Sequence, residues 1–199
     1  MRKRMGIFCV GLGITCLLGA VGFVLYNRWE AQNAAQITQS LLENVQTRIE
    51  QDALQESILP DDAAPDTPVE MATIQVDGYA CFGILSIPAL DLELPVLADW
   101  SYTKLKKAPC HYYGSCYEKN FVIAAHNYKS HFGRLSALNA GDIVIFTDVY
   151  GIAHCYEVAL LETLQKEATM EMIASDFDLS LYTCTPGGGS RVTVRCERK

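Results

Sequence analysis

The sequence lacks an excess of positive charge, a metal-binding cysteine spacing and a nucleotide-binding loop. Its 199 residues carry 16 Lys and Arg against 23 Asp and Glu, so the net charge is −7. This balance argues against a nucleic-acid partner, which would call for a basic patch. The eight cysteines include no C-x-x-C pair of the kind that marks zinc sites. No D-x-D-x-D-G loop indicates a bound cation, and no Gly-rich phosphate loop follows a strand.

Charge is absent from residues 5–26, "MGIFCVGLGITCLLGAVGFVLY". These 22 residues match the roughly 20 apolar residues that a helix needs to cross a bilayer. A cleaved signal peptide is the alternative, but its apolar region is usually about 7–15 residues long, and "YNRWEAQ" offers no small-residue cleavage site. The basic residues 1–4, "MRKR", predict a cytoplasmic N-terminus by the positive-inside rule. We therefore predict a single-pass anchor in the cell membrane, in contact with lipid, with the remainder of the chain outside the cell.

Two segments separate this anchor from the folded part. Residues 27–58 carry apolar side chains at close to helical spacing and predict a helical spacer, solvated rather than paired with another chain. The apolar positions of this stripe are Ile37, Leu41, Val45, Ile49 and Leu54. Residues 59–70, "LPDDAAPDTPVE", hold three prolines and four acidic residues in twelve positions and predict a stiff, extended linker.

Short apolar segments bounded by turn residues fill residues 71–199. Several of them, such as "FVIAAH", "GDIVIFTD" and "SRVTVRC", are rich in Val, Ile, Tyr and Thr and alternate with polar residues. Two short helical patches, "FGRLSAL" and "ATMEMIAS", interrupt them. The pattern predicts a mainly β domain of seven or eight strands, as a mostly antiparallel barrel or sandwich.

Cysteine is abundant, and two of the eight, Cys9 and Cys16, fall in the predicted span. The other six are Cys81, Cys110, Cys116, Cys155, Cys184 and Cys196. An exported chain meets oxidising conditions, so disulfides are plausible, and a bridge between Cys110 and Cys116 is the local candidate. A metal site is the alternative to disulfides, although no spacing typical of metal ligands supports it. Its ligands would come from Cys110, His111, Cys116, His154 and Cys155.

Cys184 lies at the end of a predicted strand, "DLSLYTC", whose alternation places Leu179 and Leu181 on the face opposite Tyr182 and Cys184. Proline and glycines follow directly, which predicts a turn there. A thiol at a strand end is a candidate nucleophile if positive charge or a base lies close to it. A buried, inert cysteine is the common alternative.

The next strand, "SRVTVR", places Arg191 and Arg195 on one face with Thr193 between them, so that one hairpin could carry both the thiol and a guanidinium. An arginine stays charged and suits a developing oxyanion or a peptide carbonyl. His126 ends another apolar strand, "NFVIAAHN", in the same position that Cys184 holds on its own strand. It is the best-placed histidine to act as acid or base.

Together these residues resemble the sortases, cysteine transpeptidases of the Gram-positive cell surface. The resemblance rests on "SLYTC" with an arginine seven residues later, on "AHNYKSHFGRLSALNAGDIVIFTD", and on "GILSIPALDLELPVL", and it covers roughly residues 79–198. It implies a closed β-barrel of seven or eight strands behind an N-terminal anchor. The family usually has threonine where this chain has Ser180 and often has glycine where it has Ala125. The sortase class stays open.

The resemblance also implies a mechanism. Cys184 would attack the Thr–Gly carbonyl of an L-P-x-T-G-like sorting signal on a surface protein, giving a thioacyl enzyme. His126 would protonate the departing amine, and Arg191 would hold the oxyanion, with a backbone N–H near Thr185 as the candidate second donor. Weaker substrate contacts are assigned to Thr183, Thr185 and Arg195. An amine of the peptidoglycan cross-bridge or a pilin lysine would then accept the acyl group, and no cofactor is needed.

Other families and functions fit less well. The L,D-transpeptidases place glycine directly before their cysteine, whereas Thr183 precedes Cys184 here. Papain-like proteases have cysteine before histidine along the chain, the reverse of the order found here. A disulfide-bonded extracellular domain that binds a partner without catalysis remains as the alternative outside enzymes.

Overall fold

The computed structural model describes residues 2–56 and 70–199 of the chain. Nearly all of the predicted linker, residues 59–69, lies outside the described residues. The chain forms two compact units, residues 1–33 and residues 34–199. One long helix, α1 (Arg2–Glu56), supplies the whole described part of the first unit and the beginning of the second.

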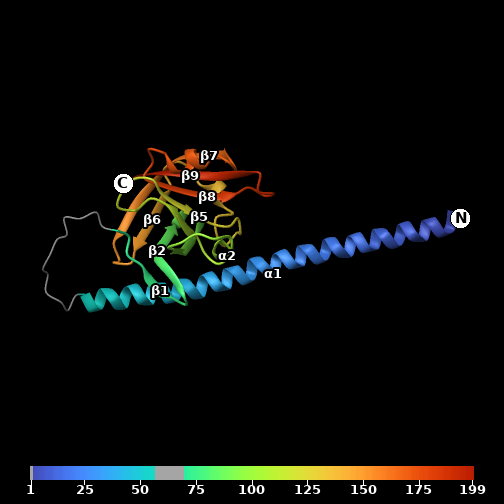
Figure 1. The fold of residues 1–199 in the computed structure, drawn as a ribbon, viewed down its shortest axis with the longest axis horizontal. Coiled ribbons are helices and arrows are strands. Elements are labelled where there is room, and N and C mark those ends of the chain that lie inside the picture. The colour runs from blue at the N-terminus through green and yellow to red at the C-terminus, as the bar shows by residue number, and fades with distance from the viewer. Residues whose placement is uncertain (1, 57–69) are drawn as a thin grey trace. The chain divides into compact units, whose positions relative to one another are not determined.

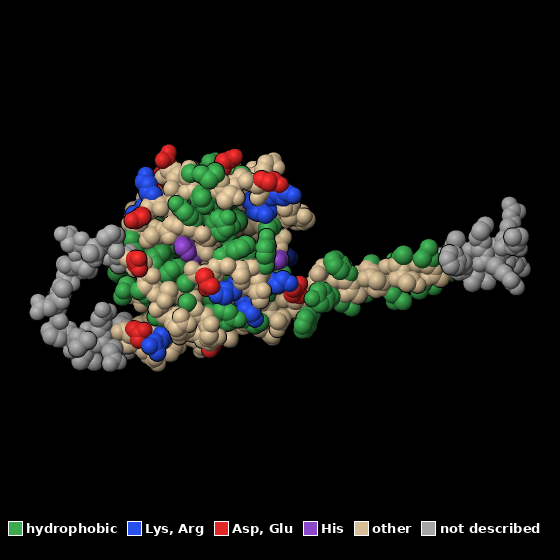
Figure 2. All heavy atoms as spheres, in the orientation of Figure 1, with side chains coloured by type: hydrophobic (Ala, Val, Ile, Leu, Met, Phe, Trp, Pro, Cys, Tyr) green, Lys and Arg blue, Asp and Glu red, His purple; other side chains and the backbone are tan. Residues whose placement is uncertain are grey.

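The first unit is an apolar helical segment. Its large hydrophobic side chains from Val10 to Trp29 are exposed, and Figure 2 shows green side chains along this segment. By length and composition, α1 contains one stretch able to cross a membrane. The helix continues without a break through the predicted boundary at residue 26.

The second unit is built on a β-barrel (Figure 1). Its nine strands are β1 (Ile74–Val76), β2 (Tyr79–Ile87), β3 (Leu92–Leu97), β4 (Cys110–Tyr113), β5 (Phe121–Ala124), β6 (Ile143–Asp148), β7 (Ala153–Gln165), β8 (Leu179–Cys184) and β9 (Ser190–Arg198). The strand order is β1-β2-β3-β4-β5-β8-β9-β7-β6, and β6 pairs back onto β2. The eight strands β2 to β9 therefore close a ring, with β1 attached outside it, which confirms the predicted closed barrel.

Short helical turns connect these strands. They are η1 (Pro88–Leu90), α2 (Tyr102–Leu105), η2 (Leu135–Ala137) and α3 (Thr169–Ile173). Most strand pairs are antiparallel, but β3–β4 and β5–β8 are parallel. The second parallel pair matters most for function, because it brings the C-terminal ends of two strands to the same rim.

Alternation along the strands fills the barrel interior. Leu179 and Leu181 of β8 and Val194 and Cys196 of β9 lie in the main core together with Phe121. The faces predicted for these last two strands are therefore confirmed. The opposite face of the hairpin, which carries Tyr182, Cys184 and Arg191, is left for other contacts.

The second half of α1 packs on the outside of the barrel. Leu41, Leu42, Val45 and Ile49 are buried in one cluster with residues of β1, β2, β3 and β4. Each such side chain contributes roughly 1.5–3 kcal/mol when fully buried. The prediction of a solvated spacer is therefore wrong for residues 34–49. The apolar stripe was read correctly, but its partner is the barrel of the same chain.

The described cysteines form no disulfides. Cys16, Cys81, Cys110, Cys116, Cys155, Cys184 and Cys196 are all free. The expected Cys110–Cys116 bridge is wrong, because Cys110 lies under α1 and Cys116 lies in the barrel core, in separate clusters. The disulfide-bonded binding domain considered above loses its basis with it.

Candidate active site

Two parallel strands carry His126 and Cys184 to one rim of the barrel. β5 and β8 pair in parallel, with Ala124 opposite Tyr182. The pairing continues past the strand end, because the Ala125 N–H donates to the Tyr182 carbonyl oxygen at 3.1 Å. His126 and Cys184 each follow two residues after the Ala124–Tyr182 pair. The imidazole and the thiol therefore leave the sheet at the same edge.

Thr183 fastens the two strands at this edge. Its hydroxyl donates to the Ala125 carbonyl oxygen at 2.8 Å, and the residue is 4% exposed. We expected Thr183 to contact substrate, but its hydroxyl proton is used inside the protein and it has almost no free surface. The side chain instead holds the residue before His126 beside the residue before Cys184.

Arg191 lies directly across the β8–β9 hairpin from Cys184. Opposite residues of an antiparallel pair have Cα atoms about 5 Å apart. Cys184 is exposed and Arg191 is half-buried. The Arg191 Nη1 atom donates to the carbonyl oxygens of Gly188 and Ser190, both at 3.1 Å. Within the described part of the chain these bonds occupy only Nη1, which leaves the other donors of the guanidinium for a ligand.

The turn after Cys184 is closed by its own hydrogen bonds. The Thr185 N–H donates to the Ser190 carbonyl oxygen at 3.0 Å, and the Thr185 hydroxyl accepts from the Ser190 N–H at 3.2 Å. Gly187 and Gly188 follow with φ of +84° and +74°, a conformation that favours glycine. The Thr185 N–H is thus committed within the turn and does not serve as the second oxyanion donor considered above.

The loop after His126 is tightly wound. The His126 carbonyl oxygen accepts from the Phe132 N–H at 3.2 Å, and the Tyr128 carbonyl oxygen accepts from the Gly133 N–H at 2.9 Å. A Cβ atom at Gly133 would lie 2.4 Å from the Asn127 carbonyl oxygen, so only glycine fits there. Phe132, fully buried, anchors the loop in the core. The "FGRL" motif thus secures the segment that carries His126.

Aromatic and imidazole rings pack together on this loop. The rings of His126 and Tyr128 stack with centroids 4.0 Å apart and planes 20° apart. Tyr128 in turn contacts His131, with centroids 5.5 Å apart. The sequence pattern singled out neither His131 nor Tyr128, because neither follows a periodic pattern that marks a site.

A small aromatic pocket adjoins Arg191 on the outer face of the hairpin. Its volume is about 220 Å³, and its lining includes Trp100, Tyr102, Tyr112, Met172, Tyr182 and Arg191. Tyr112 packs edge-on against both Trp100 and Tyr182. Burial, and then the neighbouring Tyr112, raises the pKa of Tyr182 well above its ordinary value. The pocket therefore offers neutral aromatic walls and one guanidinium, which suits an apolar segment of peptide.

Arg195, four residues beyond Arg191 on the same strand, is part of the protein interior. It is 2% exposed, and its Nε donates to Glu162 Oε1 at 2.7 Å. Its Nη1 donates to the Ser180 hydroxyl at 2.8 Å, and both Nη atoms donate to carbonyl oxygens of α3. This burial does not fit the weak substrate contact that we assigned to Arg195. The residue instead holds α3, whose Met172 lines the aromatic pocket.

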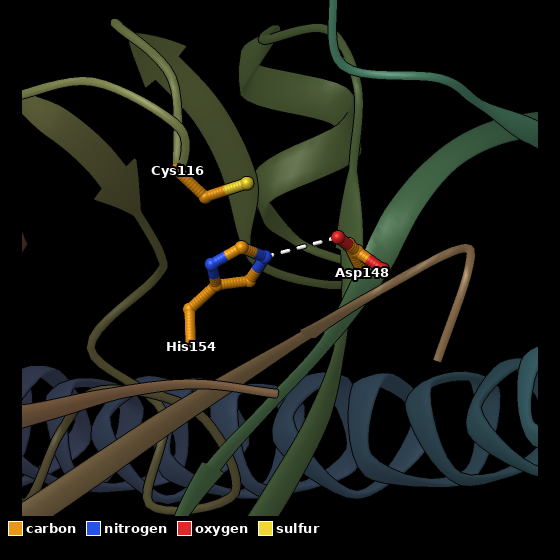
Figure 3. Close-up of side chains that lie close together, drawn as sticks. All are labelled: Cys116, Asp148 and His154. Carbon is orange, nitrogen blue, oxygen red and sulfur yellow. Dashed lines mark hydrogen bonds and ion pairs between the residues drawn. The ribbon is translucent and has the colours of Figure 1, made fainter. Parts of the chain in front are cut away.

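A second group of thiol, imidazole and carboxylate lies inside the barrel. Cys116, Asp148 and His154 point toward one another (Figure 3), with donor atoms within 4.8 Å of each other. This group contains two members of the metal alternative raised above but not the Cys110–His111 pair. Cys116 is fully buried, and burial followed by the charge of Asp148 raises its thiol pKa to about 12. A protonated thiol closed to solvent does not suit nucleophilic attack.

Asp148 organises the turn between β6 and β7. Its Oδ1 atom accepts from the N–H groups of Tyr150 and Ile152 at 2.9 and 3.0 Å. Its Oδ2 atom accepts from the Tyr117 hydroxyl at 2.9 Å and lies 2.9 Å from His154 Nε2. Four partners fill the acceptor capacity of a carboxylate. A metal ion would have to displace some of them, so the group is best described as a structural hydrogen-bond centre.

Comparison with protein families gives one match, the Sortase domain, over residues 85–199. No curated protein matches the chain. The matched segment covers more than half of the sequence and includes His126, Cys184 and Arg191.

Several solved structures share the fold. Sortase A from Corynebacterium diphtheriae is 23% identical with a TM-score of 0.55, and the match covers 61% of each chain. Sortase C1 from Streptococcus suis is 26% identical with a TM-score of 0.53, covering 60% of this chain and 73% of that one. A sortase D5 transpeptidase from Clostridium perfringens is 16% identical with a TM-score of 0.60, and the match covers 82% of this chain and 99% of that one.

Proposed function

Because the chain belongs to the sortase family of cysteine transpeptidases, we propose that it cleaves an L-P-x-T-G-like sorting signal between threonine and glycine and transfers the acyl group to an amine. Cys184 is the nucleophile, His126 the general acid and base, and Arg191 the oxyanion donor. The observation that carries this proposal is the parallel β5–β8 pair, together with the Cys184–Arg191 pair across the hairpin. Among the cysteines of the barrel and its packed helix, Cys184 combines exposure with these two neighbours.

The reaction proceeds in two displacements. The Cys184 thiolate adds to the threonine carbonyl carbon, and the carbonyl electron pair moves to oxygen. When this intermediate collapses, the C–N bond to glycine breaks and His126 gives its proton to the leaving amine. In the second half the acceptor amine attacks the thioester, His126 takes its proton, and the Cys184 thiolate leaves. The products are a new amide and the free enzyme.

Arg191 supplies the positive charge that both steps need. A guanidinium keeps its charge at any working pH and stabilises the oxyanion formed in each displacement. Its position across from Cys184 supports this role, as does the commitment of the Thr185 N–H to its own turn. The same charge favours the thiolate form of Cys184.

The aromatic pocket is the proposed site for the apolar residues of the sorting signal. Trp100, Tyr112 and Tyr182 supply flat apolar walls, and Arg191 lines the same pocket. A peptide held there would extend past Arg191 toward Cys184, because these two residues face each other across the hairpin. Thr185, half-buried in the turn, stays a weak candidate for a peptide contact.

The cellular setting belongs to the same proposal. The apolar helix is proposed to anchor the enzyme in the cell membrane, with the basic residues 1–4 in the cytoplasm and the barrel outside. Its partners would be surface proteins that carry a C-terminal sorting signal and an amine of peptidoglycan. The order of tail, anchor, helical segment, linker and catalytic domain stays a prediction, with residues 34–49 now counted with the domain.

The experiment that tests this proposal uses the full chain in detergent micelles. It is incubated with a small panel of L-P-x-T-G-like peptides, with and without triglycine, and followed by mass spectrometry. We expect a thioacyl adduct that maps to Cys184 and a ligated product that needs triglycine. Both must be lost in Cys184→Ala and persist in Cys155→Ala, the matched control at another exposed thiol. An adduct that survives Cys184→Ala would refute the assignment.

A further inference from the structure

A hydroxyl on α1 contacts the loop that carries His126. Thr38 is 4% exposed, and its Oγ1 lies 2.8 Å from His131 Nε2. The same oxygen lies within hydrogen-bond reach of the Lys107 carbonyl oxygen, at 2.5 Å. Both Thr38 and His131 belong to the unit of residues 34–199, so this contact lies within one compact body.

The direction of these hydrogen bonds follows from their number. A threonine hydroxyl has one proton, and its oxygen lies 2.9 Å from the Ala34 carbonyl oxygen and 2.5 Å from the Lys107 carbonyl oxygen, both of which can only accept. The Thr38 oxygen therefore accepts from His131 Nε2–H. His131 is fully buried, and burial followed by the charge of His126 lowers its pKa to about 4. The ring is thus neutral at physiological pH, with its one proton on Nε2 and its orientation fixed by Thr38.

From His131 a line of ring contacts leads to His126. His131 packs against Tyr128, and Tyr128 stacks on His126 with centroids 4.0 Å apart. The backbone of the same loop is closed by the His131 N–H, which donates to the Tyr128 carbonyl oxygen at 3.0 Å. A shift of the His131 ring would therefore change the surface against which the His126 ring rests.

We propose that Thr38 and His131 are positioning residues for the reaction: Thr38 on α1 fixes the His131 ring, which with Tyr128 holds the His126 imidazole in line with the departing amine. The inference rests on the proposed role of His126 as general acid. Proton transfer depends steeply on alignment, because a misplacement of about 1 Å can cost roughly 100-fold in rate. Helix α1 would therefore contribute to catalysis by orienting His126.

The charge state of His131 supports the same arrangement. A second cation beside His126 would oppose protonation of the general acid through like-charge repulsion. A neutral imidazole gives the rigid, planar contact without that cost. The Nδ1 atom of His131 is buried and has no hydrogen-bond partner within the described residues, so the Thr38 contact is the one that orients the ring.

The test compares Thr38→Val, which keeps the shape and removes the hydroxyl, with Thr38→Ser, which keeps the hydroxyl. Both are made in the full chain in detergent micelles and assayed with a sorting peptide and triglycine. We expect Thr38→Val to lower kcat about tenfold with KM within about twofold, and Thr38→Ser to retain most of kcat. Val45→Ala is the matched control, because Val45 lies on the same helix as Thr38, is fully buried, and belongs to a cluster that does not include His131.

A second variant, at His131, tests the same path independently, so that the result does not depend on whether one variant folds. His131→Gln keeps an N–H near Thr38 but removes the ring that contacts Tyr128, and it should also lower kcat. If both residues act through one path, the double variant with Thr38→Val should be no slower than the slower single variant. Melting temperatures of all variants identify any that is not folded at the assay temperature.

The outcomes separate cleanly. Unchanged kcat in folded Thr38→Val, with normal acylation of Cys184 in the wild type, overturns the positioning role and leaves the proposed function standing. An equal loss of kcat in Val45→Ala would mean that helix packing in general, not the Thr38 hydroxyl, matters, and also overturns it. Absence of wild-type acylation would remove the proposed function, and this inference would fall with it.

Discussion

Replacing Arg195 by methionine should destabilise the barrel, whereas the same change at Arg191 should remove activity and leave stability nearly unchanged. Methionine keeps much of the apolar length of the side chain and removes the charge and the donors. The two residues share one face of β9 and are four positions apart. Their surroundings differ, because Arg195 is 2% exposed beneath α3 and Arg191 borders an open pocket.

The magnitude for Arg195 follows from its partners. Arg195→Met leaves the Glu162 carboxylate, the buried Ser180 hydroxyl and two α3 carbonyl oxygens without their donor. Breaking a fully buried ion pair costs about 3–5 kcal/mol. The Glu162 side chain is 31% exposed, so water will offset part of this loss. We expect a fall of about 3 kcal/mol in the free energy of unfolding, or about 10 °C in melting temperature.

The magnitude for Arg191 follows from its proposed role. Its hydrogen bonds go to two carbonyl oxygens of an exposed turn, so Arg191→Met should change the melting temperature by no more than about 2 °C. Loss of one oxyanion donor typically costs roughly 100- to 1,000-fold in kcat. Arg195→Met, assayed well below its melting temperature, should mainly raise KM for the sorting peptide, because α3 forms a wall of the aromatic pocket.

The assay is thermal melting of the full chain in detergent, followed by near-ultraviolet circular dichroism, beside peptide transfer kinetics on the same samples. Near-ultraviolet signals report the tertiary packing of aromatic residues, most of which lie in residues 71–199, rather than helix content. The reasoning would be refuted if Arg195→Met melted within about 2 °C of the wild type, or if Arg191→Met kept near-normal kcat.

Three further predictions concern the loop, the buried histidine and the thiols. Gly133→Ala should lower the acylation rate, because its Cβ would lie 2.4 Å from the Asn127 carbonyl oxygen and must shift the His126 loop; unchanged kinetics would contradict this. The pKa of His131 is about 4 in the folded chain against an ordinary 6.5, so the unfolded chain binds the extra proton between these values. Melting temperature should therefore fall as pH drops from 6.5 toward 4, and a dependence that is just as steep in His131→Gln would contradict the assignment. Methanethiosulfonate reagents should label only Cys184 and Cys155 within residues 34–199, as read by peptide mapping, and early labelling of Cys116 would show that the core is open.

The closed barrel and its last hairpin could be predicted because they depend on local signals. Alternation in "DLSLYTC" and "SRVTVRC" fixed which side chains enter the core, and the strand ends fixed where Cys184 and His126 emerge. In each strand, the alternating residues and the turn residues that end the strand lie within a few positions of one another. The parallel pairing that brings the two ends together is a long-range feature, and no local signal predicted it.

The functions of individual polar residues were harder to predict. Alternation places Arg191 and Arg195 on one face, but it cannot reveal that α3 covers only the second. Thr38 and His131 are 93 positions apart and meet only because α1 returns to the barrel. The group of Cys116, Asp148 and His154 likewise has no fixed spacing. Such contacts depend on tertiary packing, which local sequence patterns do not reveal.

The ring of strands has a consequence for how an extended peptide can be recognised. Every strand of the ring has neighbours on both sides, and β1, attached outside it, is three residues long. Apart from the junction of β3 and β4, which pair only at Leu97 and Cys110, a peptide that reaches the enzyme therefore finds little free backbone on which to add itself as another strand. Selection must come from what its side chains offer to a pocket, so the enzyme can ignore the many unfolded segments that β-sheet edges would otherwise capture.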